Sequence, residues 1–486
     1  MSSETKTLPR GRVARFWERL RRPNRAHVEK LKERVPFWFV ALVLFAFSVL
    51  QIMLNPFGFS DLTQRYAQDI SNLLVTGPFL YPTTGRDLVT VALIDEDTLH
   101  KLEMPWPWTY GMHARALNAL LAYKPKAVIV DFLFVDMRPD ESIGELVDAI
   151  GRYRRANIPI YFEGGTDLSY GEAAIRPEIA ATGVPVLSPT IDVYDGVVRQ
   201  YPASGPCFGA KAPGNGQCLS LALQAYKDLF PEHPLEPMNG EMEIVWGTKT
   251  SPFNNRYSAQ PCNADMPFAL RIYRAFFDKQ SAMERCPYNN DIPMQAILTD
   301  DGSDKDLQEL IPGHIVLYGG GLEGAQDKSF SPVNGQQSNV FVHAMALDNL
   351  ITFQGKPEQN VMTVLGVTMS NNPAQILAIV PVILILSWMH MRRIRARRRG
   401  TKERSALAEW FLDKGVENLW HWFAFFLALA VGLALARLAG LSVANWVEDV
   451  FVSVELAAML LIGLPDSLWG YLHHVAGGDP ERGRPT

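Results

Sequence analysis

The sequence predicts an α/β protein with a mainly parallel β-sheet and flanking helices in one large domain, joined to about four transmembrane α-helices. Two observations predict the domain. Short β-rich runs alternate with helical patterns between residues 55 and 372, and the alternation begins with a strand–helix–strand unit. A third observation, four apolar runs that flank this domain, predicts the membrane helices.

The first strand–helix–strand unit is the clearest part of the predicted domain. Residues 88–95 (LVTVALID) form an apolar run that is typical of a buried parallel strand. Thr109 can cap the helix TYGMHARALNALLAY, because its hydroxyl can accept an unpaired backbone N–H. Residues 127–134 (AVIVDFLF) predict the next strand, which completes the unit.

The rest of the domain continues the alternation. We expect a helix at IGELVDAIGRYRRA, a strand at IPIYFEG, a hairpin that turns at Asp195–Gly196, and a helix at LSLALQAYKDLF. Further along, MEIVW and HIVLYGG predict strands, and MPFALRIYRAFFDKQSAM and VHAMALDNLIT predict helices. The polar stretches 247–262 and 299–311 predict loops.

All the cysteines lie inside this domain, as expected in an oxidising compartment that allows disulfides to form. Three pairings are compatible with the sequence. The short separations favour Cys207 with Cys218 and Cys262 with Cys286. No C-x-x-C spacing indicates a zinc site instead.

The apolar runs divide the chain, and their flanking charges predict its topology. Ten Lys and Arg residues lie between Arg10 and Arg34, and eight lie between Arg392 and Arg404, so both flanks are expected in the cytoplasm. A cleavable signal peptide is the rival interpretation of the first run, but the small-residue cleavage site is absent. The expected segments are a basic N-terminal segment 1–35, a span 36–54, an extracytoplasmic domain 55–372, a span 373–390, a basic amphipathic loop 391–418, spans 419–440 and 448–465, and a short tail 466–486.

Two charged residues fall within or beside the last apolar runs. Arg437 lies near the outer end of the third span, and Glu455 lies inside the fourth. A hairpin of the two spans would place both at similar depth, so an ion pair is the simpler interpretation. The functional alternative is that Glu455 binds a partner's membrane helix or relays protons.

Several stretches resemble the CHASE-two domain, the second type of cyclase/histidine-kinase-associated sensory extracellular domain of bacterial receptors. They occur in the family's order over about residues 60 to 355. The resemblance implies a receptor that passes a signal through membrane helices to a cytoplasmic cyclase, kinase or phosphatase. Because the sequence stops about 20 residues after the fourth apolar run, we expect a separate chain to supply that output. The matching stretches are VTVALIDEDTLHKL, PWPWTYGMHARALNAL, KAVIVDFLF, DVYDGVVRQYP, CLSLALQAY, IPGHIVLYGG, QDKSFSP and VFVHAMALDNLI.

Three aspartates that end or follow predicted strands form the candidate ligand site: Asp95, Asp131 and Asp327. Ligands of open α/β sheets bind beyond the carboxyl ends of the strands, and Asp95 and Asp131 come from sequential strands that could be neighbours. The plain alternative is that Asp95 caps a helix, Asp131 accepts backbone N–H groups and Asp327 fixes a loop.

Aromatic, histidine and glycine residues near these strands also have a functional and a structural interpretation. Trp106 and Trp108 could line a ligand site or close the end of the core. His113 and His343 are expected to be core histidines. Gly319, Gly321 and Gly324 match G-x-G-x-x-G, but no helix pattern follows, so a flexible turn is the better interpretation.

The sequence therefore predicts a multi-pass protein of the bacterial plasma membrane that senses a ligand or envelope component and signals through a partner protein. The alternative is a structural or assembly subunit of an envelope complex. No G-x-S-x-G, P-loop or kinase signature indicates an enzyme, and no cofactor or metal is expected. The expected partners are the lipid bilayer and an output protein, and a homo-oligomer is compatible with the sequence. The basic runs are topology signals rather than nucleic-acid contacts.

Overall fold

The computed structural model describes most of residues 68–357, the backbone of 361–364 and 367–370, and five isolated residues, 42, 45, 46, 49 and 65. Within 68–357 the gaps are 71, 136–138, 168–171, 192, 194–195, 207–216, 239, 258–265, 279–282, 284–285, 323 and 325–326. The chain divides into two compact units, Gln68–Asn360 and the two ends, Met1–Ala67 with Val361–Thr486.

A six-stranded sheet forms the centre of the unit Gln68–Asn360, and every pairing in it is parallel. This confirms the predicted α/β architecture with a mainly parallel sheet. Of these six strands, the one that comes last along the chain, β12, lies between β1 and β2. In order across the sheet the strands are β11 (Asn290–Pro293), β1 (Val89–Ile94), β12 (Ile315–Gly320), β2 (Ala127–Asp131), β3 (Ile160–Glu163) and β6 (Val186–Leu187).

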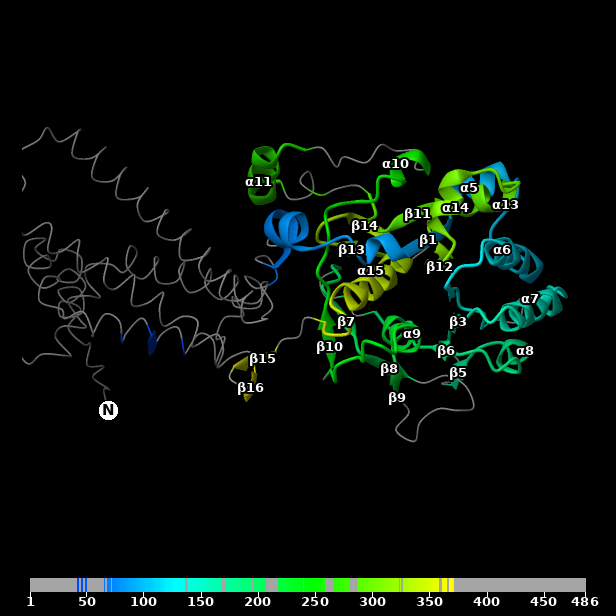
Figure 1. The fold of residues 1–486 in the computed structure, drawn as a ribbon, viewed down its shortest axis with the longest axis horizontal. Coiled ribbons are helices and arrows are strands. Elements are labelled where there is room, and N and C mark those ends of the chain that lie inside the picture. The colour runs from blue at the N-terminus through cyan, green and yellow to red at the C-terminus, as the bar shows by residue number, and fades with distance from the viewer. Residues whose placement is uncertain are drawn as a thin grey trace, which may run out of the picture. The chain divides into compact units, whose positions relative to one another are not determined.

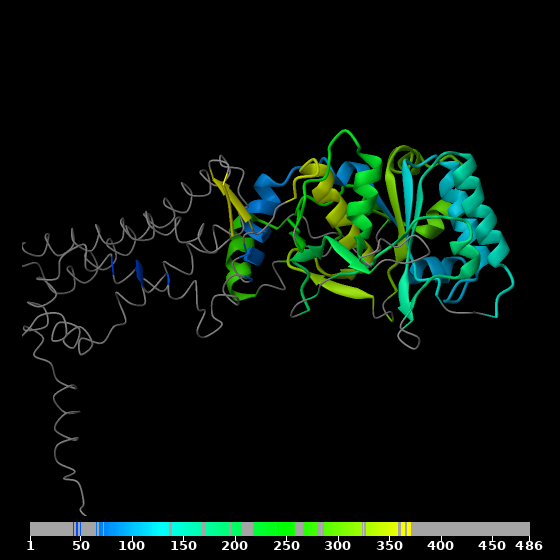
Figure 2. The same ribbon diagram turned by 90° about the horizontal axis from the view of Figure 1, so that it is seen from below.

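Helices cover both faces of the sheet, which gives three layers (Figures 1 and 2). Side chains alternate between the layers along each strand: in β1, Val91 and Leu93 enter one core, and Ala92 and Ile94 enter the other. The first core lies under α15 (Asn339–Thr352) and α9 (Leu221–Leu229). The second lies under α6 (Tyr110–Ala122), α7 (Ile143–Arg155), α13 (Met294–Thr299) and α14 (Lys305–Leu310).

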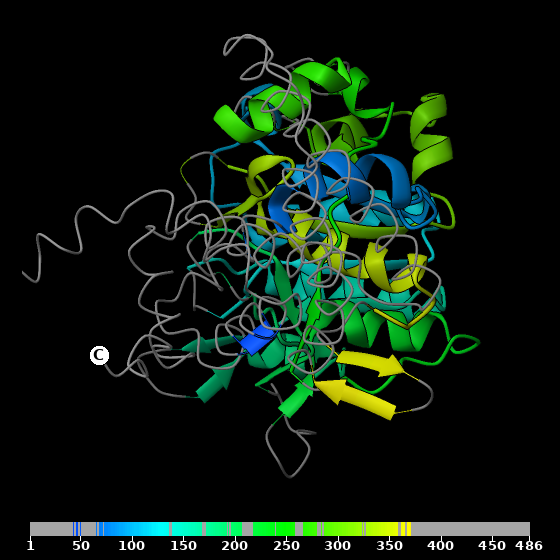
Figure 3. The same ribbon diagram turned by 90° about the vertical axis from the view of Figure 1, so that its left-hand side faces the viewer.

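Shorter elements surround the three layers. Helix α11 packs against the helical turn η1 at one end of this unit (Figures 1 and 3). The short helices are η1 (Asn72–Leu80), η2 (Arg86–Leu88), α5 (Glu96–Lys101), α8 (Pro177–Ala180), α10 (Asn254–Tyr257) and α11 (Phe268–Phe277). The antiparallel pairs are β7 (Gln200–Pro202) with β10 (Glu241–Glu243), β13 (Lys328–Ser331) with β14 (Gly335–Ser338), β4 (Gly165–Asp167) with β5 (Glu172–Ala174), β8 (Ser204–Pro206) with β9 (Gln217–Leu219), and β15 (Val361–Val364) with β16 (Val367–Ser370).

Three local predictions were wrong. The strands expected on either side of Asp195–Gly196 do not pair with each other among the described residues, because β6 joins β3 in the large sheet and β7 pairs with β10. The expected loop 247–262 contains α10, and the expected loop 299–311 contains α14. Helix α14 begins where the Asp304 carboxylate accepts backbone N–H groups, and its few apolar side chains are buried in the second core.

The predicted membrane helices lie almost entirely outside the described residues, so they stay a prediction. In the part of the chain that the structure describes, no helix combines the length and the apolar character needed to cross a bilayer.

Candidate functional site

Two carboxyl groups and an imidazole meet at the carboxyl edge of the large sheet. Asp131 is the last residue of β2, Glu163 is the last residue of β3, and His343 lies in the second turn of α15. All three side chains are buried, with 7%, 3% and 1% of their surfaces exposed. One ligand atom from each residue lies within 4.8 Å of the others, so this cluster could hold a metal ion.

The sequence brings the two acids together through strand register and alternation. In the parallel pair, Val130 lies opposite Phe162, so the next residues along the strands, Asp131 and Glu163, are neighbours. Both follow residues that enter the second core, so both side chains turn toward the first core. That face is the one under α15, which carries His343.

The histidine links the acids to a tyrosine. Its Nε2 lies 3.3 Å from Oε1 of Glu163, and its Nδ1 lies 2.7 Å from the hydroxyl of Tyr201. The Tyr201 hydroxyl also accepts the backbone N–H of Ala222 at 3.3 Å. Burial lowers the pKa of His343 to about 3, so the imidazole is neutral at physiological pH and its contact with Glu163 is not an ion pair.

Burial also keeps protons on the acids. The pKa of Glu163 lies well above its usual value because of burial and the nearby charge of Asp131. Burial and then the charge of Asp327 raise the pKa of Asp131 to about 7, while a hydrogen bond with Glu163 opposes that rise. The hydrogen bond between the two acids raises the pKa of Glu163 and lowers that of Asp131, so Glu163 is the donor and Asp131 the acceptor.

The structure brings together two of the three predicted aspartates. Asp327 lies close enough for its charge to act on Asp131 and Glu163, and its own carboxylate accepts a 2.6 Å hydrogen bond from Nδ2 of Asn339. Asp95 lies apart from them, because β12 separates β1 from β2. Asp95 caps α5 by accepting the N–H of Thr98 at 2.8 Å.

The two predicted tryptophans belong to an aromatic group on the other face of the sheet. Trp108 is buried in the second core, whereas Trp106 is 39% exposed. Both rings lie against the imidazole of His113, with ring centres about 6 Å apart. Nδ1 of His113 lies 2.9 Å from the hydroxyl of Tyr318, as expected for a core histidine.

Glu163, His343 and Tyr201 were not predicted as site residues. Glu163 ends the predicted strand IPIYFEG, so the strand-end rule that selected Asp131 would also have selected it. His343 and Tyr201 carry no such local signal. Their place in the site depends on the packing of α15 and β7 onto the sheet.

A polar crevice lies at the carboxyl ends of β1 and β12 and alongside β11. It encloses about 210 Å³, and Asp291, Lys328 and Gln337 are among its lining residues. Oδ1 of Asp291 and Oε1 of Gln337 are buried and have no hydrogen-bond partner in the described part of the chain. Burial and the charge of Asp95 raise the pKa of Asp291 to about 7.

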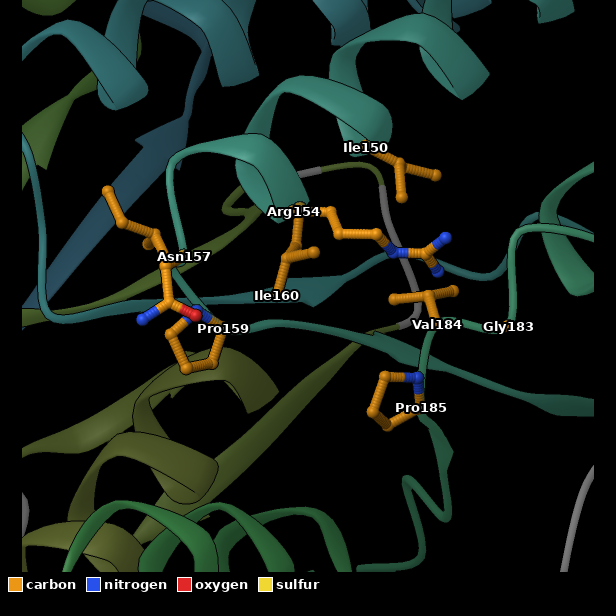
Figure 4. Close-up of a pocket in the computed structure, with 9 residues that line it drawn as sticks. Ile150, Arg154, Asn157, Pro159, Ile160, Gly183, Val184 and Pro185 are labelled. Carbon is orange, nitrogen blue, oxygen red and sulfur yellow. The ribbon is translucent and has the colours of Figure 1, made fainter.

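A second hollow, of about 250 Å³, lies at the opposite edge of the sheet (Figure 4). The C-terminal end of α7 and the segments before β3 and β6 form it, with Arg154 and Asn157 as its polar side chains. Arg154 donates a hydrogen bond to the carbonyl of Thr182. No acid lines this hollow, so it has fewer ionisable groups for binding a ligand than the carboxyl edge of the sheet.

The remaining predicted residues lie largely outside the described ones. Cys218 and Cys286 are disulfide-bonded, and no described cysteine is a free thiol. Cys207, Cys262, Arg437 and Glu455 fall outside the described residues. The cysteine pairing and the intramembrane ion pair therefore stay predictions.

Comparison with known proteins gives one match. The family model of the CHASE2 domain matches residues 37–386, which is well over half of the chain. No curated protein matches the sequence, and no solved structure matches the fold.

Proposed function

The chain belongs to the CHASE2 domain family, and from this membership we propose that it is a receptor subunit of a signalling system in the bacterial plasma membrane. The family is one of sensory extracellular domains. In this proposal the α/β unit lies outside the cytoplasm and binds a ligand or an envelope component. The signal then passes to a separate partner protein.

The polar crevice is the observation that carries the sensory role. Each buried oxygen without a hydrogen-bond partner costs about 1–3 kcal/mol of folding stability, so Asp291 and Gln337 weaken the fold unless they bind something. Both oxygens accept hydrogen bonds, which suits a ligand that presents ammonium, amide or hydroxyl groups. Lys328 adds a cation at the same crevice. The site therefore suits a small polar ligand with donor groups and an anionic group.

The predicted membrane part supports the use of a separate output protein. Residues 373–465 contain the three predicted spans and the basic loop 391–418. The basic loop and the charged residues Arg437 and Glu455 are the proposed contacts for the partner.

Affinity purification of the full-length chain from its own membranes in mild detergent, followed by mass spectrometry, tests this proposal. We expect a protein with a cyclase, kinase, phosphatase or regulator domain to co-purify. An Asp291→Leu/Lys328→Met double variant should retain that partner and lose the regulation of its activity. Recovery of the chain alone and monomeric would refute the proposed output through a partner.

An exposed apolar face favours the second candidate function, a structural or assembly subunit. Several aromatic and aliphatic side chains of α11 are exposed, and Phe79 of η1 packs against Phe268 with ring centres 5.3 Å apart. Such patches often mark protein–protein or membrane contacts. The exposed side chains are Phe79, Phe268, Leu270, Ile272, Tyr273 and Phe277.

The two functions predict different losses in the same purification. A Tyr273→Ser/Phe277→Ser variant should release envelope-complex proteins if this face assembles them. The same variant should leave a signalling partner bound if the crevice carries the function. Both side chains are exposed, so their replacement should have little effect on folding stability.

A further inference from the structure

We propose that Asp131, Glu163 and His343 bind a divalent transition-metal ion, and that Zn²⁺ is the ion best suited to these three ligands. The site extends the proposed function, because a metal ion would then be one of the ligands that the sensor binds. Only the physiological role of the metal ion rests on the proposed function. The binding itself follows from the geometry.

The three ligand atoms already lie close to one another. They come from two adjacent strand ends and from a helix that packs over them, and they lie within 4.8 Å of one another. Zinc bonds to nitrogen and oxygen are about 2.0–2.2 Å long, so two ligands of one ion lie at most about 4.4 Å apart. Nε2 of His343 and Oε1 of Glu163 are already within that limit at 3.3 Å. A small inward movement of side chains therefore completes the arrangement.

Unused oxygens point to a missing partner at this cluster. Oδ2 of Asp131 and Oε1 of Glu163 are buried and have no hydrogen-bond partner among the described residues. Both side chains are more than nine-tenths buried, so solvent does not satisfy these atoms. At Gly319, a Cβ atom would lie only 3.0 Å from Oδ2 of Asp131, so this glycine preserves the space beside that oxygen.

The charge around the cluster also favours a cation. Asp131, Glu163 and Asp327 supply three carboxyl groups at one place, and in the described part of the chain no Lys or Arg forms an ion pair with any of them. Buried carboxylates require a counter-charge or a proton. A divalent ion that displaces the proton shared by Asp131 and Glu163 would balance the charges of both carboxylates without any further side chain.

Tyr201 has the position of a residue that orients a metal-binding histidine. Its hydroxyl lies 2.7 Å from Nδ1 of His343, which leaves Nε2 directed at the two acids. Metal-binding histidines usually hold a hydrogen bond at the other ring nitrogen, which fixes the ring orientation. Tyr201 is therefore a positioning residue in this proposal.

The mixture of ligands selects the ion. An imidazole nitrogen is a preferred ligand of zinc and other first-row transition metals, whereas calcium takes oxygen ligands, six to eight of them in number as a rule. One nitrogen and two carboxyl groups are three of the four ligands that zinc takes, so the fourth position would stay open to water or another ligand. Calcium serves as the negative probe for this reason.

The experiment measures metal binding on the purified full-length chain. The protein is treated with a chelator and then dialysed against zinc chloride or calcium chloride. Inductively coupled plasma mass spectrometry then gives the number of metal ions bound per chain. We expect the wild-type chain to bind one zinc ion. Glu163→Gln and His343→Gln should each weaken the zinc affinity at least about 100-fold, and Tyr201→Phe should weaken it about 10- to 100-fold. Calcium should not bind at this site.

Matched variants separate ligand loss from unfolding. Asp348→Asn changes another buried carboxyl group on α15, outside the cluster, and should retain zinc at the wild-type level. Zinc should also raise the unfolding temperature of the wild type and of Asp348→Asn, but not that of Glu163→Gln. If His343→Gln does not fold, Asp131→Asn takes its place, because this replacement preserves the side-chain shape.

Two results would overturn the inference. One is a wild-type chain that binds no stoichiometric zinc and shows no rise in unfolding temperature. The other is zinc that stays bound in both Glu163→Gln and Asp131→Asn. Either result leaves the sensory proposal open to its own test, because that test scores the partner protein and the crevice residues Asp291 and Lys328.

Discussion

The Tyr81 hydroxyl donates a 2.5 Å hydrogen bond to Oδ1 of Asp348, and this contact joins the beginning of the α/β unit to its last long helix. Both groups are buried. Asn289 also donates to this carboxyl group, from Nδ2 to Oδ2 at 3.1 Å. The contact therefore ties three distant parts of the chain together at one buried acid.

Removal of the Tyr81 hydroxyl should destabilise the fold. We expect Tyr81→Phe to lower the free energy of unfolding by about 1–3 kcal/mol, because a buried carboxyl group loses a donor. Urea unfolding of the full-length chain measures the change. Tyr273→Phe is the control, since that side chain is 61% exposed and its replacement should change little. Equal losses for both variants would contradict the proposed role of the buried contact.

The buried Asp348 should make stability depend on pH. Burial raises its pKa to about 7, above its value in the unfolded chain, so the folded state holds this proton more tightly. Its contribution is most favourable below about pH 4 and is lost as the pH rises toward 7, at up to about 1.4 kcal/mol per pH unit. Unfolding free energies of the wild type and of Asp348→Asn, measured from pH 4 to 8, should converge at low pH, and a parallel pair of curves would rule out this contribution.

The ion pair of Arg199 with Asp69 should be essential for folding. Its two bonds are 2.8 and 3.0 Å long, and both side chains are buried. Arg199→Met removes a buried cation from the Asp69 carboxylate and should cost about 3–5 kcal/mol. Arg256→Met breaks an exposed pair with Asp306 and should cost less than about 1 kcal/mol. The difference between the two unfolding free energies is the measurement.

Asp95 should act as a helix cap rather than as a ligand. Its carboxylate accepts the N–H of Thr98 at the start of α5. Asp95→Ala should therefore cost about 1 kcal/mol, while Asp95→Ser should retain most of the stability, because serine is also a good cap. Neither variant should change zinc binding. Loss of zinc binding in Asp95→Ser would show that Asp95 contributes to the metal site.

The crevice should lower the stability of the fold. Gln337→Met removes an unpaired buried oxygen and retains the side-chain volume, so we expect unchanged or higher unfolding free energy, by up to about 1 kcal/mol. Thermal unfolding of the full-length chain tests this. A marked loss of stability would show that Gln337 holds the fold together rather than serving a ligand.

Much of the fold could be predicted from the sequence because strong apolar runs form its central strands. The runs at β1, β2 and β12 are continuous, and Thr109 begins α6 as expected by accepting the N–H of Met112. Strand β11 (NDIP) was missed because it is short and polar, and β6 was assigned to a hairpin because its place depends on pairing with β3.

The site was predicted in part because sequence order does not give strand order. Asp131 and Asp327 do lie close together in the structure, but Asp95 was grouped with them on the assumption that sequential strands are neighbours. The insertion of β12 between β1 and β2 breaks that assumption. Residues on separate elements, such as His343 and Tyr201, meet through packing that local patterns do not encode.

Helix α15 gives the unit a direct mechanical connection between its sites and its ends. Phe341 lines the crevice, His343 belongs to the acidic cluster, and Asp348 holds Tyr81 near the beginning of the unit. These residues share one helix of 14 residues, so they move together unless the helix bends. A ligand that shifted α15 would therefore displace the Asp348 contact with Tyr81 and the C-terminal end of the helix at Thr352 together.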